Sequence, residues 1–363
     1  MPDLSALLHH RFGVNYTPSQ NWYFCFNDWN PGDIARDLAT IASIGADHIR
    51  VMVVWPSFQP NPRYISPAHL DRLDTLMMLA AAEGLDVMPT VFTGWLSGYR
   101  FEPPFLQDQP FYTSPDWAAA QTLLVTALSD RMHQHPNFLG FDIGNEINCC
   151  WQTTPRKGDA WMARVFAQMQ AAHPGKVHVN GVDHKPWFQP DGFSAKALVD
   201  AQPIVALHCW PFWTGAGDRG GPLDRPYTHL GAAMATLARS LGHAPQKPVW
   251  IQEFGVCATE MLEADIPRWT EGFVTTAIDA GVSWFTWWAS HDVPRRFDFH
   301  PFEYGLGLID SDNRVKPQGH LFRDLATAYR GKPVRLPTTV PPPPTVRAPV
   351  ATWDWMNDWN AQV

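Results

Sequence analysis

The stretch HIRVMVVW at residues 48–55 decides the predicted fold, because this mostly apolar run lies between two helical patterns. Before it, apolar residues recur at helical spacing over residues 34–44, and Gly45 follows them as a C-terminal glycine does. After it, a Ser-Pro pair at 66–67 is typical of a helix start, and this second helix is expected to continue to about residue 84. A strand between two helices indicates a β–α unit of a parallel sheet.

The same alternation of short apolar strands and helical patterns repeats along the chain. Strands are expected at residues 12–16, 48–55, 85–92, 138–145, 177–182, 204–210, 248–255 and 282–288. Helices are expected at residues 31–44, 66–84, 115–135, 158–173, 194–200, 227–242, 264–280 and 317–329. Strict alternation of this kind predicts an α/β protein, a (β/α)8 TIM barrel that forms a single domain over residues 1–330. A doubly wound open sheet is the alternative, although it would not require the even count.

Residues 331–363 break the alternation. They contain the proline-rich run PTTVPPPPTVRAP, which is typical of polyproline II, and they end with WDWMNDWN at residues 353–360. A free tail does not need three tryptophans, so we expect the tail to dock on the barrel or on a neighbouring subunit of a homo-oligomer. A disordered end is the alternative.

Charge and hydropathy argue against two classes of partner. The net charge of −8 is dispersed and no basic stripe occurs, so nucleic acid is not expected as a partner. No run of 18 apolar residues occurs, so no membrane-spanning helix is expected. The start MPDLSALLHHRFG shows no signal peptide, and the five cysteines form no disulfide framework. These features predict a cytoplasmic protein, with the periplasm left open.

Aromatic residues gather in the segments that follow predicted strands. The chain has 18 tryptophans, whose flat rings offer faces on which sugar C–H groups stack. Long segments follow strands three, six and eight at residues 93–114, 209–226 and 289–316, whereas the segments before strands are short. In a barrel the segments after the strands form the catalytic face, so we expect the functional site there. Packing in a large core is the alternative role for many of the tryptophans.

Two glutamates stand at predicted strand ends on this face. Glu146 follows Asn145 at the end of strand four, and Glu253 lies at the end of strand seven. A barrel brings these ends to opposite sides of one mouth. Glycosidic bond cleavage needs two carboxylates, one protonated and one ionised, and a separation of about 5–5.5 Å allows attack with retention of configuration.

The residues next to these glutamates support this interpretation. Arg50 lies inside strand two, where a charge needs a partner, and we expect it to pair with Glu253, lower its pKa and keep it ionised. Asn145 can donate a hydrogen bond to a sugar 2-hydroxyl. The alternative is that each glutamate only forms a salt bridge at the end of its strand.

Four segments resemble motifs of glycoside hydrolase clan A, family 5: GNEIN at 144–148, IQEFG at 251–255, IRVMVVWP at 49–56 and FTWWASHD at 285–292. The resemblance covers about residues 12–330. It implies a (β/α)8 barrel, hydrolysis with retention and no cofactor. It also implies that Glu146 is the general acid/base and Glu253 the nucleophile. The residues that it implies around the sugar of the −1 subsite are Arg50, Asn145, His208 and Trp288.

A narrower resemblance concerns RFGVNYTPS at 11–19, WPSFQPN at 55–61 and FTGWLSG at 92–98. These segments are similar to the exo-acting β-mannosidases of family 5, subfamily 18. The resemblance implies removal of terminal β-1,4-linked mannose from small oligosaccharides such as Man-β1,4-GlcNAc of the N-glycan core. A β-glucosidase or an endo-β-1,4-mannanase is the alternative within the family. A non-catalytic carbohydrate-binding barrel is the alternative of another class.

Two positions depart from the family pattern. Many members carry a histidine in the strand-three loop, where TVFTGW offers Thr93 and Trp95. Many also carry a tyrosine two residues after the strand-six histidine, where HCW places Trp210. An indole N–H donates a hydrogen bond but neither accepts one nor titrates. We therefore keep Trp95 and Trp210 as candidate substrate-binding residues and expect the family pattern to fit least well at Trp210.

His291 and the cysteines complete the set of candidate residues. His291 and Asp292 follow strand eight, where they could bind sugar hydroxyls or pair with arginines of the same loop. A second group lies just past strand ends and contains soft metal ligands: Cys149, Cys150, Cys209, Cys257 and His208. No Cys-x-x-Cys spacing occurs, so we expect packing thiols and no metal.

Overall fold

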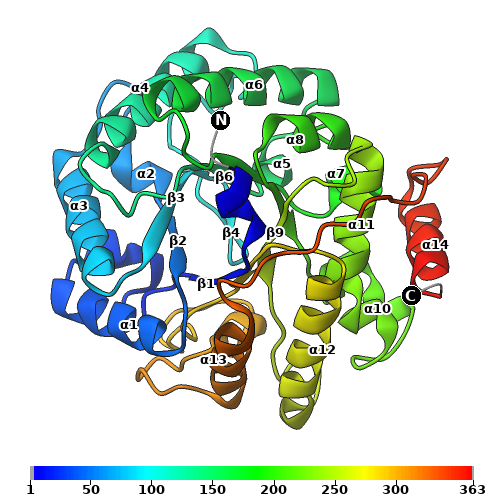
Figure 1. Cartoon of the computed structure of the whole chain (residues 1–363). Coiled ribbons are helices and arrows are strands. Elements are labelled where there is room, and N and C mark those ends of the chain that lie inside the picture. Colours follow the sequence, from blue (N-terminus) through cyan, green and yellow to red (C-terminus); the bar gives the residue numbers. More distant parts are fainter. Residues whose placement is uncertain (1–3, 362–363) are drawn as a thin grey trace.

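Eight of the ten strands in the computed structural model, which describes residues 4–361, form one parallel sheet. The strands are β1 (Arg11–Asn15), β2 (His48–Met52), β3 (Asp86–Thr93), β4 (Trp95–Leu96), β5 (Tyr99–Arg100), β6 (Asp142–Asn145), β7 (Val179–Gly181), β8 (Val205–His208), β9 (Val249–Phe254) and β10 (Trp284–Trp287). The order in the large sheet is β7-β6-β3-β2-β1-β10-β9-β8. β7 lies beside β8 and nearly closes the ring, which confirms the predicted (β/α)8 barrel (Figure 1).

Helices surround the sheet and connect successive strands (Figure 1). The longer helices are α1 (Pro31–Ser43), α3 (Pro67–Ala82), α4 (Pro115–Met132), α6 (Pro155–Ala172), α8 (Ala195–Ala201), α11 (Leu230–Gly242), α12 (Ile266–Asp279), α13 (Pro317–Tyr329) and α14 (Pro349–Asn360). The short ones are α2 (Trp55–Phe58), α5 (Ile147–Cys150), α7 (Lys185–Phe188), α9 (Pro211–Thr214), α10 (Arg225–Thr228), η1 (Leu4–Leu8), η2 (Trp22–Phe26), η3 (Ala216–Asp218), η4 (Glu263–Asp265) and η5 (Pro301–Tyr304). None of the helices over residues 4–361 has the length and apolarity needed to cross a bilayer.

Two predicted segments differ in detail from the structure. The helix expected at 227–242 is interrupted at His229, so that α10 precedes it and α11 follows it. The segment 93–114, expected as a loop, contains the antiparallel hairpin of β4 and β5. Ser97 and Gly98 connect these strands with φ of 52° and 87°. Two left-handed residues in succession are typical of the tight turn that joins a two-residue hairpin.

The short helix η1 packs against the N-terminal end of the barrel. Leu7 of η1 packs with Met88, Trp250 and Trp284 in a buried cluster below the strands. In Figure 1 this first helix lies across the middle of the ring. The opposite end, where the strands reach their carboxyl termini, is where a pocket opens.

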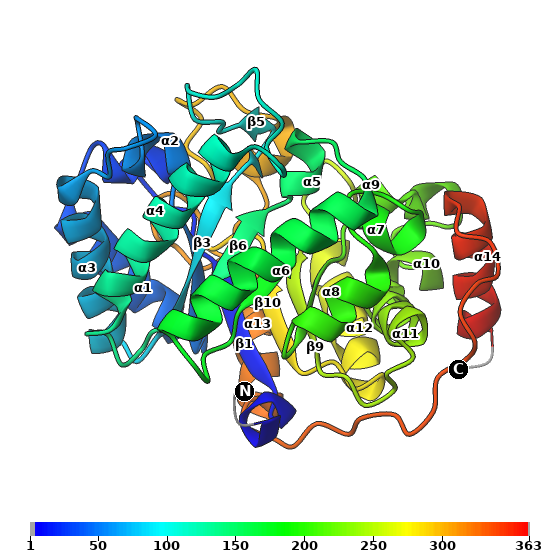
Figure 2. The same ribbon diagram turned by 90° about the horizontal axis from the view of Figure 1, so that it is seen from above.

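Residues 331–361 run along the barrel and end in α14 on its flank (Figure 2). α14 packs against α11, and Trp353 is buried there. The Trp353 indole donates a hydrogen bond to the carbonyl of Thr214 at 2.7 Å, and the Thr352 hydroxyl donates to the carbonyl of Phe188 at 2.9 Å. The C-terminal helix therefore contacts the segment that follows β8.

Candidate active site

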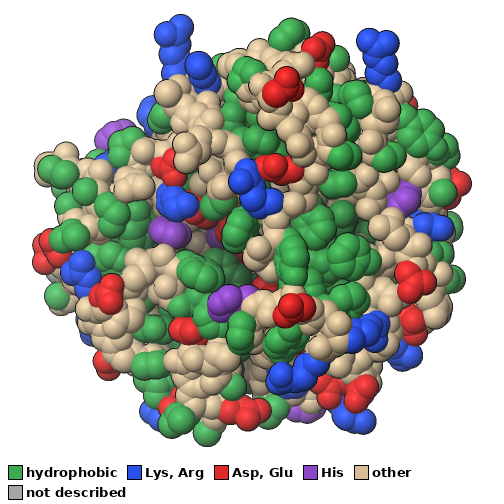
Figure 3. Space-filling model, turned by 180° about the vertical axis from the view of Figure 1, so that it is seen from behind, with side chains coloured by type: hydrophobic (Ala, Val, Ile, Leu, Met, Phe, Trp, Pro, Cys, Tyr) green, Lys and Arg blue, Asp and Glu red, His purple; other side chains and the backbone are tan. Residues whose placement is uncertain are grey.

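A pocket of about 300 Å³ opens at the C-terminal ends of the barrel strands. Asn145, Glu146 and Glu253 contribute polar groups to it from strand ends. Its walls come from the segments that follow β3, β8 and β10, which are the three long aromatic segments. Figure 3 shows a hollow on this face, bordered by hydrophobic side chains and histidines.

The chain turns sharply after β6 to present Glu146. Glu146 has φ 46° and ψ 40°, in the left-handed region that residues other than glycine rarely adopt. Its N–H donates to the carbonyl of Gly181 at 2.8 Å, and α5 begins at the next residue. Strained backbone of this kind is concentrated at functional sites, because the surrounding structure must hold it in place.

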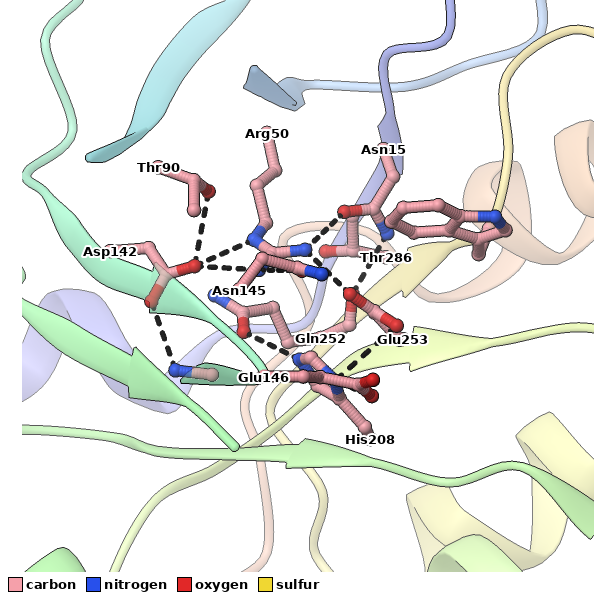
Figure 4. Close-up of polar contacts among 12 residues, drawn as sticks. Asn15, Arg50, Thr90, Asp142, Asn145, Glu146, His208, Gln252, Glu253 and Thr286 are labelled. Carbon is pink, nitrogen blue, oxygen red and sulfur yellow. Dashed lines mark hydrogen bonds and ion pairs between the residues drawn. The ribbon is translucent and has the colours of Figure 1, made fainter. Parts of the chain in front are cut away.

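A buried ion network lies under the two glutamates (Figure 4). Arg50 donates from Nη1 to Oε1 of Glu253 at 2.7 Å. Its Nε and Nη2 donate to Oδ2 of Asp142 at 2.9 and 2.6 Å. The same guanidinium donates to the side-chain oxygens of Asn15 and Asn145 at 2.9 and 2.7 Å. Arg50 is thus paired with two carboxylates and satisfied by two amides, which is what a buried charge needs.

Gly181 of β7 leaves the room that this network needs. A Cβ atom added at Gly181 would lie 2.5 Å from Oε1 of Gln252, 2.9 Å from Nε2 of His208 and 3.1 Å from Nη2 of Arg50. Its N–H also donates to Oδ1 of Asp142 at 2.9 Å. Any larger residue would displace the side chains that support the pocket.

Trp210, in the segment after β8, contacts Glu253 on the side away from Arg50. Its Nε1 donates to Oε2 of Glu253 at 3.2 Å. Burial raises the pKa of Glu253 above its ordinary value, while His208 and Arg50 oppose the rise. The predicted lowering of this pKa by the charge of Arg50 is confirmed as one of the contributions. Arg50 acts in the expected direction, but loss of water around the carboxylate outweighs it.

Glu146 lies in a different electrostatic environment. Burial raises the pKa of Glu146 to about 8, Asp183 adds to the rise, and Arg50 and Lys185 oppose it. Its Oε1 lies 2.8 Å from Nδ1 of His208. At neutral pH this environment favours a protonated Glu146, whereas Glu253 touches a guanidinium directly.

The two glutamates are close enough to act on one bond. One oxygen of each, together with one ring nitrogen of His208, lies within 4.8 Å of the others. This spacing is close to the about 5–5.5 Å of retaining glycosidases and shorter than the about 6.5–9.5 Å of inverting ones. Within residues 4–361 this trio is also the one group of His, Cys, Asp or Glu side chains spaced to share a metal ion. The five cysteines are free and do not belong to it.

The structure brings together most of the residues singled out from the sequence. The predicted residues that line the pocket are Trp95, Asn145, Glu146, Trp210, Glu253 and Trp288. Arg50 and His208 lie directly beneath and touch both the strand ends and the glutamates. His291 does not join them, because its buried ring contacts the Ser290 hydroxyl at 3.0 Å and Oδ1 of Asn313 at 3.1 Å. The expectation that His291 binds substrate is corrected by this position.

Sequence reasoning missed several polar residues of the site. Asp142 binds Arg50 from within β6, where an acidic residue in a buried strand was an available signal. Glu303 lines the pocket from η5 and Ser97 from the turn between β4 and β5, and no spacing in the sequence marks either as a site residue. Gln252 accepts a hydrogen bond at Oε1 from Nε2 of His208 at 3.1 Å, and it directly precedes Glu253 in sequence.

The family model Cellulase (glycosyl hydrolase family 5) matches residues 10–292 of the chain. A GH5_18 structure from Bifidobacterium longum subsp. infantis is 30% identical over 90% of this chain and 80% of its own, with a TM-score of 0.86. A GH5_18 variant from Streptomyces cattleya in complex with Manβ1-4GlcNAc is 29% identical over 97% of this chain and 92% of its own, with a TM-score of 0.88.

An exo-beta-1,4-mannosidase from Opitutaceae bacterium strain TAV5 shares the fold at 24% identity, over 91% of this chain and 62% of its own, with a TM-score of 0.79. No curated protein matches the chain. The family model covers well over half of the sequence, and its range contains both glutamates and the arginine beneath them. The chain therefore belongs to glycoside hydrolase family 5 and is a glycosidase.

Proposed function

We propose that this glycosidase is a retaining exo-β-mannosidase that removes terminal β-1,4-linked mannose from small oligosaccharides, Manβ1-4GlcNAc among them. The observation that carries the proposal is the pair of strand-end glutamates, whose oxygens approach within 4.8 Å inside a walled pocket. Retaining glycosidases use two carboxylates at about this spacing. The presence of both carboxylates argues against a barrel that binds sugar without hydrolysing it.

In the proposed reaction Glu253 is the nucleophile. Its carboxylate attacks the anomeric carbon while the glycosidic bond breaks, and a covalent glycosyl-enzyme forms. Arg50 and Trp210 donate to its two oxygens, Oε1 and Oε2, and so orient the carboxylate. Both donors also favour its ionised form.

Glu146 has the complementary role of general acid and then general base. With its pKa raised to about 8 it holds a proton at neutral pH, which it gives to the leaving oxygen. It then takes a proton from the water that hydrolyses the glycosyl-enzyme, and the configuration at the anomeric carbon is retained.

His208 keeps the Glu146 proton in place. Burial lowers the pKa of His208, so its ring is neutral and carries one N–H. Nε2 faces Oε1 of Gln252 at 3.1 Å, and because a carbonyl oxygen can only accept, that nitrogen carries the hydrogen. Nδ1, which also lies 3.3 Å from Oε2 of Glu253, then offers its lone pair to the nearer Oε1 of Glu146 at 2.8 Å. A protonated Glu146 satisfies this contact as the donor.

The walls of the pocket support exo action on a small substrate. Trp95, Trp210 and Trp288 offer ring faces and edges around the glutamates, and sugar rings stack on such surfaces. The volume of about 300 Å³ is at the low end for ligand sites and suits a short saccharide rather than a polymer. Mannose as the terminal sugar is supported by the GH5_18 proteins that bind Manβ1-4GlcNAc.

A panel of substrates tests the proposal. We expect p-nitrophenyl β-mannoside and Manβ1-4GlcNAc to be cleaved with a higher kcat/KM than p-nitrophenyl β-glucoside, and mannan to be cleaved poorly. NMR of the first product should detect β-mannose before mutarotation. Preference for the glucoside would make the enzyme a β-glucosidase, and internal cleavage of mannan would make it an endo-mannanase. First release of α-mannose would contradict the retaining mechanism.

A further inference from the structure

The pocket wall contains a carboxylate that the proposed reaction does not use. Glu303 lies in η5, between β10 and α13, and lines the same pocket as the two strand-end glutamates. Its backbone is fixed on both sides, since its N–H donates to the carbonyl of His300 and its carbonyl accepts from Val293, both at 3.0 Å. Its Oε2 accepts a hydrogen bond from Nε1 of Trp288 at 3.4 Å. The side chain is therefore held against Trp288, the tryptophan that directly follows β10.

The charge of Glu303 is not balanced by a cation. In the described part of the chain no lysine, arginine or histidine forms an ion pair with it, in contrast to Glu253. Burial raises the pKa of Glu303 to about 7, the Trp288 and Ser97 side chains oppose the rise, and nearby Glu253 adds to it. Glu303 is half-buried, and a partly dehydrated carboxylate without a cation costs stability, so its presence in a pocket wall points to a ligand that hydrogen-bonds to it.

Ser97 brings a second polar group to the same wall. It lies in the turn of the β4–β5 hairpin, is 8% exposed and lines the pocket. Its hydroxyl is near enough to act on the Glu303 carboxylate, yet within residues 4–361 it completes no hydrogen bond. Buried hydroxyl groups are normally hydrogen-bonded, so this one is available to a ligand.

We propose that Glu303 and Ser97 form a specificity site for one hydroxyl of the terminal sugar. The sugar hydroxyl donates to the Glu303 carboxylate and accepts from the Ser97 hydroxyl. The terminal sugar is the ring concerned, because Glu303 is held by Trp288 beside the Glu253 strand end and feels the charge of Glu253. This inference rests on the proposed function only in that the ligand is a glycoside.

Such a site discriminates between sugars by the direction of one hydroxyl. A sugar that presents the hydroxyl to Glu303 gives the Ser97 hydroxyl its missing acceptor and the Glu303 carboxylate a further donor. An epimer or a deoxy sugar leaves the half-buried Glu303 carboxylate and the buried Ser97 hydroxyl without this partner, and sites of this type reject such analogues strongly.

The test combines variants with deoxy substrates. We would measure kcat and KM of wild type, E303Q and S97A with the preferred aryl glycoside and with its 2-, 3-, 4- and 6-deoxy analogues. The side-chain amide oxygen in E303Q would still accept the Trp288 hydrogen bond, so a purely structural role of Glu303 would be largely rescued. For the parent glycoside we expect kcat/KM to fall about ten- to a hundred-fold in E303Q, mainly through KM, and less in S97A.

The decisive result is the coupling between variant and substrate. One deoxy analogue should lose about ten-fold or more in wild type but far less in E303Q and S97A, because the contact is already absent. If every analogue loses as much in both variants as in wild type, the proposal is overturned. E271Q, which changes an exposed glutamate of α12, is the matched control and should behave like wild type with all substrates.

This experiment separates the two proposals. The deoxy series is built on whichever aryl glycoside the wild type prefers, so a preference for β-glucoside contradicts the mannosidase proposal and leaves the Glu303 test intact. If E303Q does not fold, which circular dichroism would reveal, S97A carries the same coupling test. Loss of the coupling in S97A supports the site, and full retention overturns it.

Discussion

The floor and the wall of the pocket are built on opposite principles. The floor consists of Arg50, Asp142, Asn145 and Glu253 on β2, β6 and β9, where every charge is paired at 2.6–2.9 Å. The wall consists of loop residues, mostly aromatic, whose one carboxylate has no cation. We therefore infer that the floor positions the reacting carboxylate, whereas the residues of the wall determine which sugar binds.

The largest effect should come from removing Glu253 and Glu146, the two groups proposed to react with the substrate. E253A should lower kcat by about four or more orders of magnitude, because the covalent step is lost. With an activated aryl glycoside, azide should rescue E146A by attack on the glycosyl-enzyme and give a β-glycosyl azide. E253A should give the α-azide, because azide then attacks the substrate directly. NMR identifies the anomer of the azide product. An α-azide from E146A and a β-azide from E253A would show that the roles of acid/base and nucleophile are the reverse of those proposed.

Loss of the buried cation should affect both activity and stability. R50M leaves Asp142 and Glu253 as unpaired buried charges, which costs about 3–5 kcal/mol in the free energy of unfolding. Urea denaturation measures this change, and kcat/KM should fall as well. R314M is the control, since the Arg314 side chain is 75% exposed and its ion pairs are worth about 0–1 kcal/mol. Equal stability of R50M and R314M would contradict the role of the network.

Trp210 belongs to the wall and donates a hydrogen bond to Glu253 of the floor. Its replacement should shift the acidic limb of the pH profile of kcat/KM. Glu253 must be ionised and Glu146 protonated, so kcat/KM should fall at acidic pH and again as pH rises through about 8. W210F removes a donor to the Glu253 carboxylate, which raises its pKa. The acidic limb should therefore move to higher pH, with a loss of about ten-fold in kcat/KM near neutrality.

A matched variant separates this effect from a general loss of packing. W269F changes a buried tryptophan of α12 whose indole N–H has no partner in the described residues. W269F should lower the free energy of unfolding without shifting either limb of the pH profile of kcat/KM. An acidic limb of W210F that coincides with that of wild type would show that the indole N–H does not act on Glu253.

The smallest effect is expected from the C-terminal helix that supports the wall. W353F keeps most of the apolar contact but removes the hydrogen bond to the carbonyl of Thr214. A buried carbonyl left without its donor costs about 1 kcal/mol, measured as the change in free energy of unfolding. Because Thr214 donates to the carbonyl of Trp210, kcat/KM should also decrease slightly. A variant as stable as wild type would show that the helix does not brace this segment.

Elements whose signals are local could be predicted well. The positions of the strand-end glutamates and of Arg50 could be predicted from polar residues within or at the end of apolar strands. The parallel strands of a barrel all end on one face, so these residues were expected to lie together. The hairpin at 95–100 was missed although a Ser-Gly pair marks its turn. His291 was misplaced because its position after a strand end does not tell which way its side chain points.

The sequence by itself determined the barrel and the strands that carry Glu146, Glu253 and Arg50, because helical and strand periods and short connections are local properties. Only the tertiary structure decided that burial raises the pKa of both strand-end glutamates, that Arg50 pairs with Asp142 and that Glu303 and Ser97 meet at one wall. These depend on how much water is excluded and on which distant side chains meet. Burial outweighs the arginine at Glu253 for that reason, and no spacing along the chain encodes it.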